Sequence, residues 1–126
     1  MNIVGAFSGY SSNDIEACRV FYGHTLGLTL EDNMGGLGFK LNGQQVFIYP
    51  KDDHEPATFT VLNFVVPDIN AAVDELVDAG VKFERYDNMP GDQDERGVMR
   101  GKDADMGPNI AWFKDPAGNI LALVED

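Results

Sequence analysis

The sequence predicts an α+β fold that contains two copies of a βαβββ module. The start of each predicted helix carries the same Asp-Ile-x-Ala pattern, at residues 14–17 and again at residues 68–71. Each helix also ends in a glycine followed by an apolar residue, at residues 27–28 and 80–81. Because self-similarity of this kind is the signature of a repeated structural unit, we interpret the chain as an internal duplication.

Length and composition indicate one globular domain. The chain has 126 residues, of which 44% are hydrophobic and 24% are charged, as in ordinary folded domains. We expect a single domain over residues 1–126. Module one is expected at about 1–50 and module two at about 58–126, with a polar connector at 51–57.

Module one is predicted to begin with a strand within residues 2–10. A helix closed by Gly27 follows, and Asn13 and Glu16 at its start have the spacing of a capping box. The apolar residues of this helix recur at helical spacing: Ile15, Cys18, Tyr22 and Leu26. Three short strands are expected after it, at residues 28–31, 38–41 and 46–49.

Module two is predicted to repeat this order. Residues 59–66 are rich in β-branched and aromatic side chains and predict a strand, after which a helix begins at Asp68 and ends at Gly80. The apolar face of this helix consists of Ile69, Val73, Leu76 and Val77. Strands are expected at residues 82–86, 109–114 and 120–124, with a further short one within 97–102. The turn sequence DPAGN at 115–119 joins the last two strands as a hairpin.

A helix on one face of each sheet leaves the other face free to curve around an enclosed pocket. Strand alternation directs five side chains toward that pocket: Phe7, Phe47, Tyr49, Asn63 and Trp112. Two interpretations remain open. The aromatic rings either fill the interior as core, or they line a cavity in which the Tyr49 hydroxyl and the Asn63 amide orient a flat, partly apolar ligand.

Two motifs resemble those of the vicinal oxygen chelate superfamily. Residues 21–27 (FYGHTLG) match its FY-x-x-x-LG pattern, and residues 112–119 (WFKDPAGN) contain its F-x-DP-x-GN hairpin. This superfamily includes glyoxalase I, extradiol dioxygenases, fosfomycin-resistance enzymes and bleomycin-resistance proteins. The resemblance covers nearly the whole chain and implies a glyoxalase/bleomycin-resistance-like fold with curved mixed sheets around a cavity.

The resemblance also implies where a divalent metal would be held. Metal-dependent members use His and Glu side chains at two positions per module, and these positions correspond here to Phe7 and Phe47 in module one and to Val61 and Ala122 in module two. None of these side chains has a metal-binding atom, so we interpret the chain as a metal-free member without a cofactor. No catalytic residue is identified. The predicted ligand-binding residues are Phe7, Phe47, Tyr49, Val61, Asn63, Trp112 and Ala122.

Two functions follow from this resemblance. The first is a metal-independent protein similar to the bleomycin-resistance branch, which binds a small molecule in an apolar and aromatic cavity. The alternative is a glyoxalase-like lyase or dioxygenase with non-standard metal ligands or none. The resemblance further implies a homodimer, with the modules paired within one chain or exchanged between chains.

Charge excludes several classes of partner. Nine Lys and Arg against 21 Asp and Glu give a net charge of −12, which repels nucleic acid and anionic membranes. No apolar run is long enough for a membrane span. The only cysteine, Cys18, cannot form an internal disulfide and is expected in the core, which favours a cytoplasmic location.

The remaining polar candidates are expected at the surface. His24 lies in the last turn of the first helix and His54 in the connector, and we interpret both as surface or structural residues. The long polar stretch at 87–107 is a candidate lid. Its carboxylates are interpreted as solvated surface, because they lack the spacing of a calcium-binding loop: Asp92, Asp94, Glu95, Asp103 and Asp105.

Overall fold

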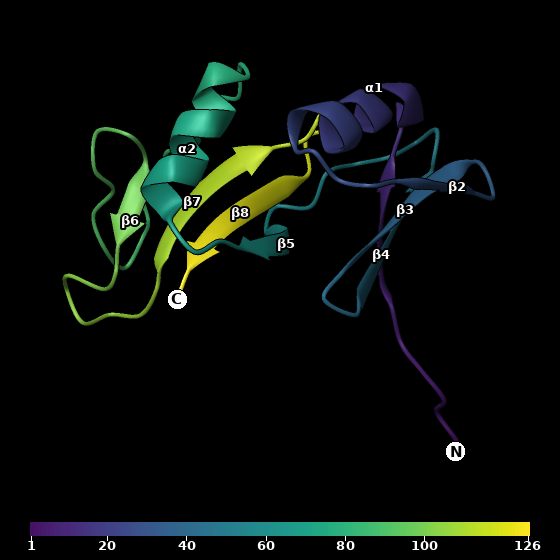
Figure 1. Cartoon of the computed structure of the whole chain (residues 1–126), viewed down its shortest axis with the longest axis horizontal. Coiled ribbons are helices and arrows are strands. Elements are labelled where there is room, and N and C mark those ends of the chain that lie inside the picture. Colours follow the sequence, from purple (N-terminus) through teal and green to yellow (C-terminus); the bar gives the residue numbers. More distant parts are fainter. The chain divides into compact units, whose positions relative to one another are not determined.

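The computed structural model describes all residues 1–126 and shows one four-stranded sheet in each half of the chain (Figure 1). The chain divides into two units, Met1–Glu55 and Pro56–Asp126. Each unit follows the order βαβββ, which confirms the predicted α+β architecture of two modules. Each sheet is open, and its order places the first and second strands of the module at the two edges.

Unit 1 has β1 (Ser8–Ser12), α1 (Ile15–Val20) with the π-helical turn η1 (Phe21–Thr25), β2 (Glu31–Asn33), β3 (Gly36–Leu41) and β4 (Gln44–Pro50). The strand order is β1-β4-β3-β2. Strand β1 runs parallel to β4, whereas β2, β3 and β4 pair antiparallel. This arrangement follows from short hairpins between the last three strands and the helical crossover after β1.

The core of unit 1 lies between the helical segment and one face of the sheet. The hydroxyl oxygens of Tyr10 and Tyr22 are 2.8 Å apart, and the Tyr22 ring stacks on Phe39 with a centroid distance of 5.8 Å. Cys18 is fully buried, and its thiol donates to Ser12 Oγ at 3.3 Å. The prediction that Cys18 belongs to the core is confirmed.

Unit 2 has β5 (Thr60–Val65), α2 (Ile69–Asp78), β6 (Val98–Arg100), β7 (Asn109–Lys114) and β8 (Ile120–Glu125). The strand order is β5-β8-β7-β6, with β5 parallel to β8 and the other pairs antiparallel. Helix α2 packs on β7 and β8. The short strand expected within 97–102 is confirmed as β6.

The hairpin between β7 and β8 is held by one buried carboxylate. Asp115 accepts hydrogen bonds from the backbone amides of Ala117 and Asn119, both at 2.9 Å. The Asn119 side-chain amide donates to the other carboxylate oxygen at 3.0 Å. The Asp115 carboxylate therefore accepts hydrogen bonds from other residues of the same turn, and the predicted hairpin at 115–119 is confirmed.

The beginning of module one differs from the prediction in two places. Strand β1 begins at Ser8, and residues 1–7 form no strand. The N-cap of α1 is Asp14, which accepts from the Ala17 amide at 3.0 Å, and not Asn13. The cap lies one residue later because the first helical residue is Ile15, and the amide of Asp14 is itself bound by Ser12 Oγ at 2.9 Å.

Two predicted strands were wrong in position or type. The strand expected at 28–31 is β2 at Glu31–Asn33, because the Leu28 amide still donates to Tyr22 O at 3.0 Å and belongs to the helix end. The strand expected at 82–86 is only a single bridge between Phe83 and Phe113. Gln93 takes the place of a strand partner there, since its side chain binds the Tyr86 amide at 2.8 Å and the Glu84 carbonyl at 3.0 Å.

None of the helices combines the length and the apolar character that a membrane crossing requires.

Candidate functional site

In unit 1, the face of the sheet away from α1 carries an aromatic pair. Phe47 and Tyr49 alternate along β4 with the buried Val46 and Ile48, so they point to the uncovered face. Their ring centroids are 6.2 Å apart at an interplanar angle of 30°. The structure thus brings together two of the residues that sequence alternation singled out.

Glycines on the neighbouring strands make room for these rings. Phe47 is paired with Gly9 on β1 and with Gly38 on β3. A Cβ at Gly36 would lie 2.2 Å from the carbonyl oxygen of Ile48 and 3.0 Å from Cε1 of Phe47. Because no side chain covers the pair from these positions, Tyr49 stays 40% exposed and offers a flat apolar surface.

A polar pair that sequence reasoning missed lies next to this surface. Ser11, the register partner of Tyr49, has its Oγ 2.6 Å from Nδ1 of His54. His54 comes from the connector after β4, where a surface or structural role was expected. The contact fastens the connector to β1, and no pattern in the sequence signals it because 43 positions separate the two residues.

In unit 2, the corresponding face holds a compact cluster of Met99, Trp112 and Ala122. Trp112 is paired with Ala122 across β7 and β8, and Asn63 on β5 is paired with Ala122 from the other side. Trp112 donates from Nε1 to Thr60 Oγ1 at 3.1 Å. Five partly buried side chains pack against this cluster: Tyr86, Met89, Ile110, Ile120 and Val124.

Tyr86 adds a polar atom to the cluster that sequence reasoning did not identify. Its ring meets Trp112 edge-on at a centroid distance of 5.8 Å. Its hydroxyl is buried and has no hydrogen-bond partner. Burial, reinforced by the negative charge of Glu84, raises the pKa of the Tyr86 phenol above its ordinary value.

Two predicted site residues have no regular strand pairing. Phe7 lies one residue before β1 and is 65% exposed. Val61 lies in a bulge, since the register between β5 and β8 shifts between Thr60 and Leu62.

The residues present do not fit the divalent metal that the family resemblance implies. Ala122 is fully buried within the Met99 and Trp112 cluster, and Phe47 lies among glycines. Phe7 and Val61 likewise supply no donor atom. In neither unit are three or more His, Cys, Asp or Glu side chains grouped as metal ligands.

A cavity of about 490 Å³ lies in unit 2 beside the cluster. Met99 belongs both to the cluster and to the cavity wall. Three of the five methionines of the chain line this cavity. The lining consists of Met89, Pro90, Gly91, Asp92, Met99, Arg100, Gly101, Asp103, Ala104 and Met106.

The 87–107 stretch that surrounds this cavity is tied to the sheet by Asp94. Burial alone would raise the pKa of Asp94, but the amides of Val98 and Arg96 and the guanidinium of Arg100 outweigh it and hold the pKa below its ordinary value. The two amides donate to Oδ1 at 2.9 Å each, and Arg100 Nε donates to Oδ2 at 3.0 Å. The interpretation of Asp94 as solvated surface was therefore wrong, because the turn before β6 folds around its carboxylate.

Some charged side chains at the cavity have a partner of opposite charge, and others do not. Arg100 is bound by Asp94 and also donates to Asn70 Oδ1 at 2.6 Å. Asp92 and Asp103 form no salt bridge (the chain has seven). The uncompensated charge at the cavity is therefore negative.

This architecture of paired βαβββ modules defines a known class of small α+β proteins. Residues 8–123 match the family model of the Glyoxalase/Bleomycin resistance protein/Dioxygenase superfamily, and the chain belongs to this superfamily. No sequence among curated proteins matches the chain significantly.

Solved structures with this fold differ in what they do. A putative glyoxalase family protein from Bacillus anthracis is 21% identical with a TM-score of 0.69, covering 100% of this chain and 98% of that one. Lactoylglutathione lyase from Agrobacterium tumefaciens is 18% identical (TM-score 0.63; 99% and 96% covered). An antibiotic binding protein from Streptomyces sp. CB03234 is 19% identical (TM-score 0.65; 99% and 98% covered). At these identities the likeness shows the fold alone, and the function has to be argued from the site.

Proposed function

We propose that this protein binds a small, partly apolar molecule without the help of a metal, and that unit 2 holds it in the cavity beside Met99. The main support for this proposal is the cavity. Its volume of about 490 Å³ lies within the range of about 300–1,000 Å³ that is typical of small-molecule sites. The absence of donor atoms at Phe7, Phe47, Val61 and Ala122 supports the metal-independent part. A binding protein is therefore favoured over a metal-dependent lyase or dioxygenase.

The thioethers of the cavity favour a flat or aromatic ligand. Met89, Met99 and Met106 are unbranched and polarizable, so they adapt to an irregular ligand and make favourable contacts with aromatic rings. Met99 lines the cavity and also belongs to the cluster that contains Trp112. In unit 1 we propose the Phe47 and Tyr49 pair as a second aromatic contact surface, and Asn63 as a polar contact on the free face of unit 2.

Charge favours a cationic ligand over an anionic one. Asp92 and Asp103 line the cavity without a salt bridge, whereas Arg100 is neutralised by Asp94. The net charge of −12 adds a long-range field that concentrates cations near the surface. We therefore expect an organic cation with an aromatic body to bind more tightly than a neutral or anionic molecule of the same shape.

Three indole compounds that differ in charge test this expectation. Tryptamine, tryptophol and indole-3-acetate share one aromatic body and are respectively cationic, neutral and anionic. Isothermal titration of the full chain at low salt should rank their affinities in that order, with steps of about two- to fivefold for exposed carboxylates. Asp92→Asn and Asp103→Asn should narrow the gap between tryptamine and tryptophol, whereas Asp52→Asn in the connector should leave it unchanged.

Two results would contradict the site. If none of the three compounds binds at millimolar concentration, the cavity is not an aromatic cation site. If Met99→Gln and both Asp variants leave tryptamine affinity unchanged, the compound binds elsewhere.

Elemental analysis tests the metal-independent part separately. Protein incubated with zinc, nickel, manganese and ferrous iron under reducing conditions and then dialysed should retain far less than one equivalent. Retention of about one equivalent per chain would overturn this part and favour the lyase or dioxygenase alternative. The free, buried Cys18 supports a reducing compartment such as the cytoplasm.

A further inference from the structure

A second hollow of unit 2 lies between helix α2 and residues 81–96, and we call it the α2 groove. Its volume of about 430 Å³ is close to that of the first cavity and falls within the range typical of small-molecule sites. The two hollows share no lining residue. Every residue that lines the α2 groove belongs to unit 2, so its walls are formed within a single unit.

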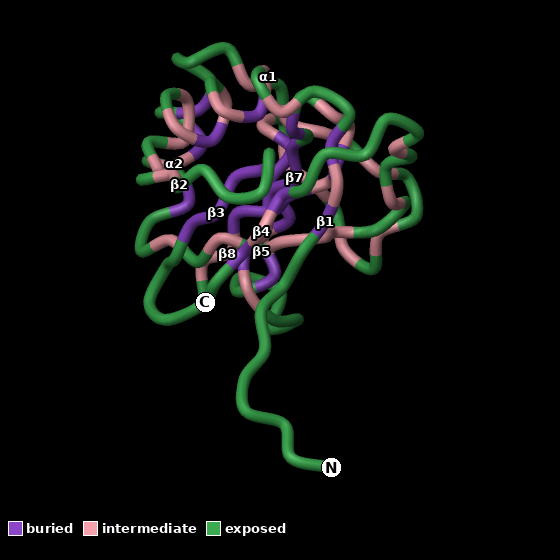
Figure 2. Tube along the Cα trace, turned by 90° about the vertical axis from the view of Figure 1, so that its right-hand side faces the viewer, coloured by how far each residue is buried: buried purple, intermediate pink, exposed green.

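The apolar surface of the α2 groove comes from two sides. Helix α2 supplies Val73 and Val77, one turn apart, and the chain after the helix supplies Val81 and Phe83. The helix carries buried and exposed residues in turn (Figure 2). Val73 is fully buried, whereas Val77 is 50% exposed. The apolar surface therefore extends from the core to the solvent, where an aliphatic body would remove it from water.

Contacts within unit 2 hold the two sides of the α2 groove in place. Arg96 forms a salt bridge with Asp74 of α2, which joins one side to the other. Phe83 packs edge-on against Phe113, with ring centroids 5.7 Å apart. The Gln93 side chain binds two backbone carbonyls at 2.7 Å and 3.0 Å on the side opposite the helix. A ligand would therefore meet a preformed site and would have to order little of the chain.

Positive charge is concentrated at the α2 groove, although the chain as a whole is strongly acidic. Three of the nine Lys and Arg of the chain line it: Lys82, Arg85 and Arg96. Asp74 neutralises Arg96, but neither Lys82 nor Arg85 forms a salt bridge. Arg85 donates to the uncharged backbone carbonyl of Gln93 at 3.4 Å. Two cations are thus available to an anionic group.

Glu95 is the one carboxylate among the lining residues, and it forms no salt bridge. With Arg96 neutralised, two cations against one carboxylate leave the local charge positive. The net charge of −12 repels an anion at long range, but salt screens that repulsion beyond about 8 Å at physiological ionic strength. A bound anion would instead be in direct contact with the cations of the groove.

We propose that the α2 groove binds a small amphiphilic carboxylate. Its aliphatic body would lie on the valines and Phe83, and its carboxylate would be bound by Lys82 and Arg85. A guanidinium group suits this role, because its paired N–H donors match the two oxygens of a carboxylate. The charge of this ligand is opposite to that of the organic cation proposed for the first cavity, so the two proposals are independent.

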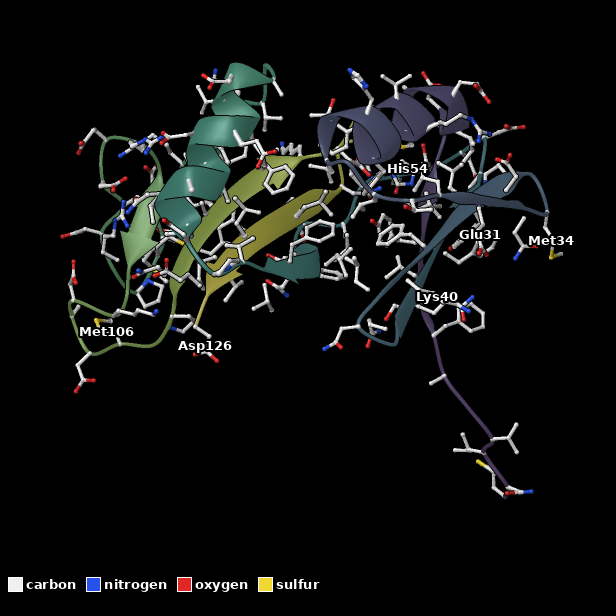
Figure 3. All side chains as sticks on the ribbon, in the orientation of Figure 1. Glu31, Met34, Lys40, His54, Met106 and Asp126 are labelled. Atoms are coloured by element: carbon white, nitrogen blue, oxygen red, sulfur yellow. The ribbon has the colours of Figure 1, made fainter.

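Octanoate and octanamide test the site, because they have the same length and similar shape but differ in charge. NMR titration of the isotope-labelled full chain at physiological ionic strength should show tighter binding of octanoate. Lys82→Gln and Arg85→Gln should each weaken octanoate about two- to fivefold and leave octanamide unchanged. Lys40→Gln is the matched control, since Lys40 is an exposed cation of β3 in unit 1 without a salt bridge (Figure 3). It should bind octanoate like the original chain.

Glu95→Gln gives a readout of opposite sign. Removal of the opposing carboxylate should tighten octanoate binding about two- to fivefold. Damage to the fold would weaken binding in all of the groove variants, so a gain in Glu95→Gln beside losses in Lys82→Gln and Arg85→Gln reports charge and not structure.

Tryptamine separates the α2 groove from the first cavity. Octanoate should shift the amide signals of residues 73–85 and not those of residues 99–106, and saturating tryptamine should leave octanoate affinity unchanged. If tryptamine fails to bind, the cavity proposal fails while the octanoate titration still decides this one. The α2 groove proposal is overturned if octanoate does not bind at millimolar concentration or binds no more tightly than octanamide. Equal effects of Lys40→Gln and Arg85→Gln, or competition with tryptamine, would also overturn it.

Discussion

The ring of Tyr86 meets the ring of Trp112 edge-on, with centroids 5.8 Å apart and an interplanar angle of 83°. This contact places the Tyr86 hydroxyl in the interior, where it has no hydrogen-bond partner. A buried polar group without a partner destabilises a fold, so its removal is expected to raise stability. The Tyr86 hydroxyl is therefore a group whose cost to stability can be measured by removing it.

Tyr86→Phe should stabilise the protein by about 1 kcal/mol, because it removes a desolvated hydroxyl and keeps the ring contact with Trp112. Urea unfolding measures the change. Tyr49→Phe, at an exposed tyrosine, should leave stability within about 0.5 kcal/mol. If the hydroxyl contacts the ligand, Tyr86→Phe also weakens tryptamine binding; a loss of stability would show that the hydroxyl has a partner after all.

Gly36→Ala should destabilise unit 1 by about 3 kcal/mol or more, since the new Cβ would lie 2.2 Å from a backbone carbonyl that cannot rotate away. The aromatic pair should be disturbed as well, because Cε1 of Phe47 lies 3.0 Å from the same Cβ position. Thermal unfolding and near-ultraviolet circular dichroism measure the two effects. Gly5→Ala is the control, as nothing lies within 4 Å of its Cβ position, and an equal loss there would refute the steric explanation.

The stability of unit 2 should depend on pH through Asp94. Its pKa is lower in the folded chain than in the unfolded chain, so its stabilising contribution is present above the unfolded value of about 4. That contribution is lost as the pH falls through the lower folded pKa. Unfolding free energies measured between pH 6 and pH 2 should therefore fall less steeply in Asp94→Asn, which is less stable at pH 6. Identical pH slopes for the two proteins would contradict this role of Asp94.

Phe47→Glu should bind no metal, because one carboxylate without further donors makes no metal site. The variant should also lower the free energy of unfolding by about 2 kcal/mol, because the half-buried carboxylate has no cationic partner. Gln45→Glu places the same charge on an exposed residue of β4 and should be neutral. Tight zinc uptake by Phe47→Glu with unchanged melting temperature would show that the strand register places Phe47 beside other ligands.

The sequence predicted the elements whose signals lie within a few residues of one another. Helix α2 begins at its Asp68 cap and is followed by Gly80, which has a positive φ of 94°. Strand β7 has the predicted bounds, and the 115–119 turn is closed by its own Asp115. Strand alternation also placed Phe47 and Tyr49 on one face of their sheet, because the period of two depends only on neighbouring residues.

Features that join distant residues depended on the tertiary structure. The side chains of residues 82–86 favour a β-strand. The Gln93 side chain, however, binds the Tyr86 amide and the Glu84 carbonyl, which a partner strand would have used. The Tyr86 hydroxyl is likewise buried without a hydrogen-bond partner because the Tyr86 ring packs on Trp112.

The sequence by itself thus determined the two modules, most of their elements, the family and the absence of donor atoms at four positions. The tertiary structure decided which polar groups meet, where a cavity forms and that residues 1–7 remain outside the sheet. The physical reason is the range of the forces that matter in each case. Caps and turns are governed by backbone hydrogen bonds between near neighbours, whereas the pairing of Ser11 with His54 and the burial of Tyr86 depend on strand registers and packing that no local pattern records.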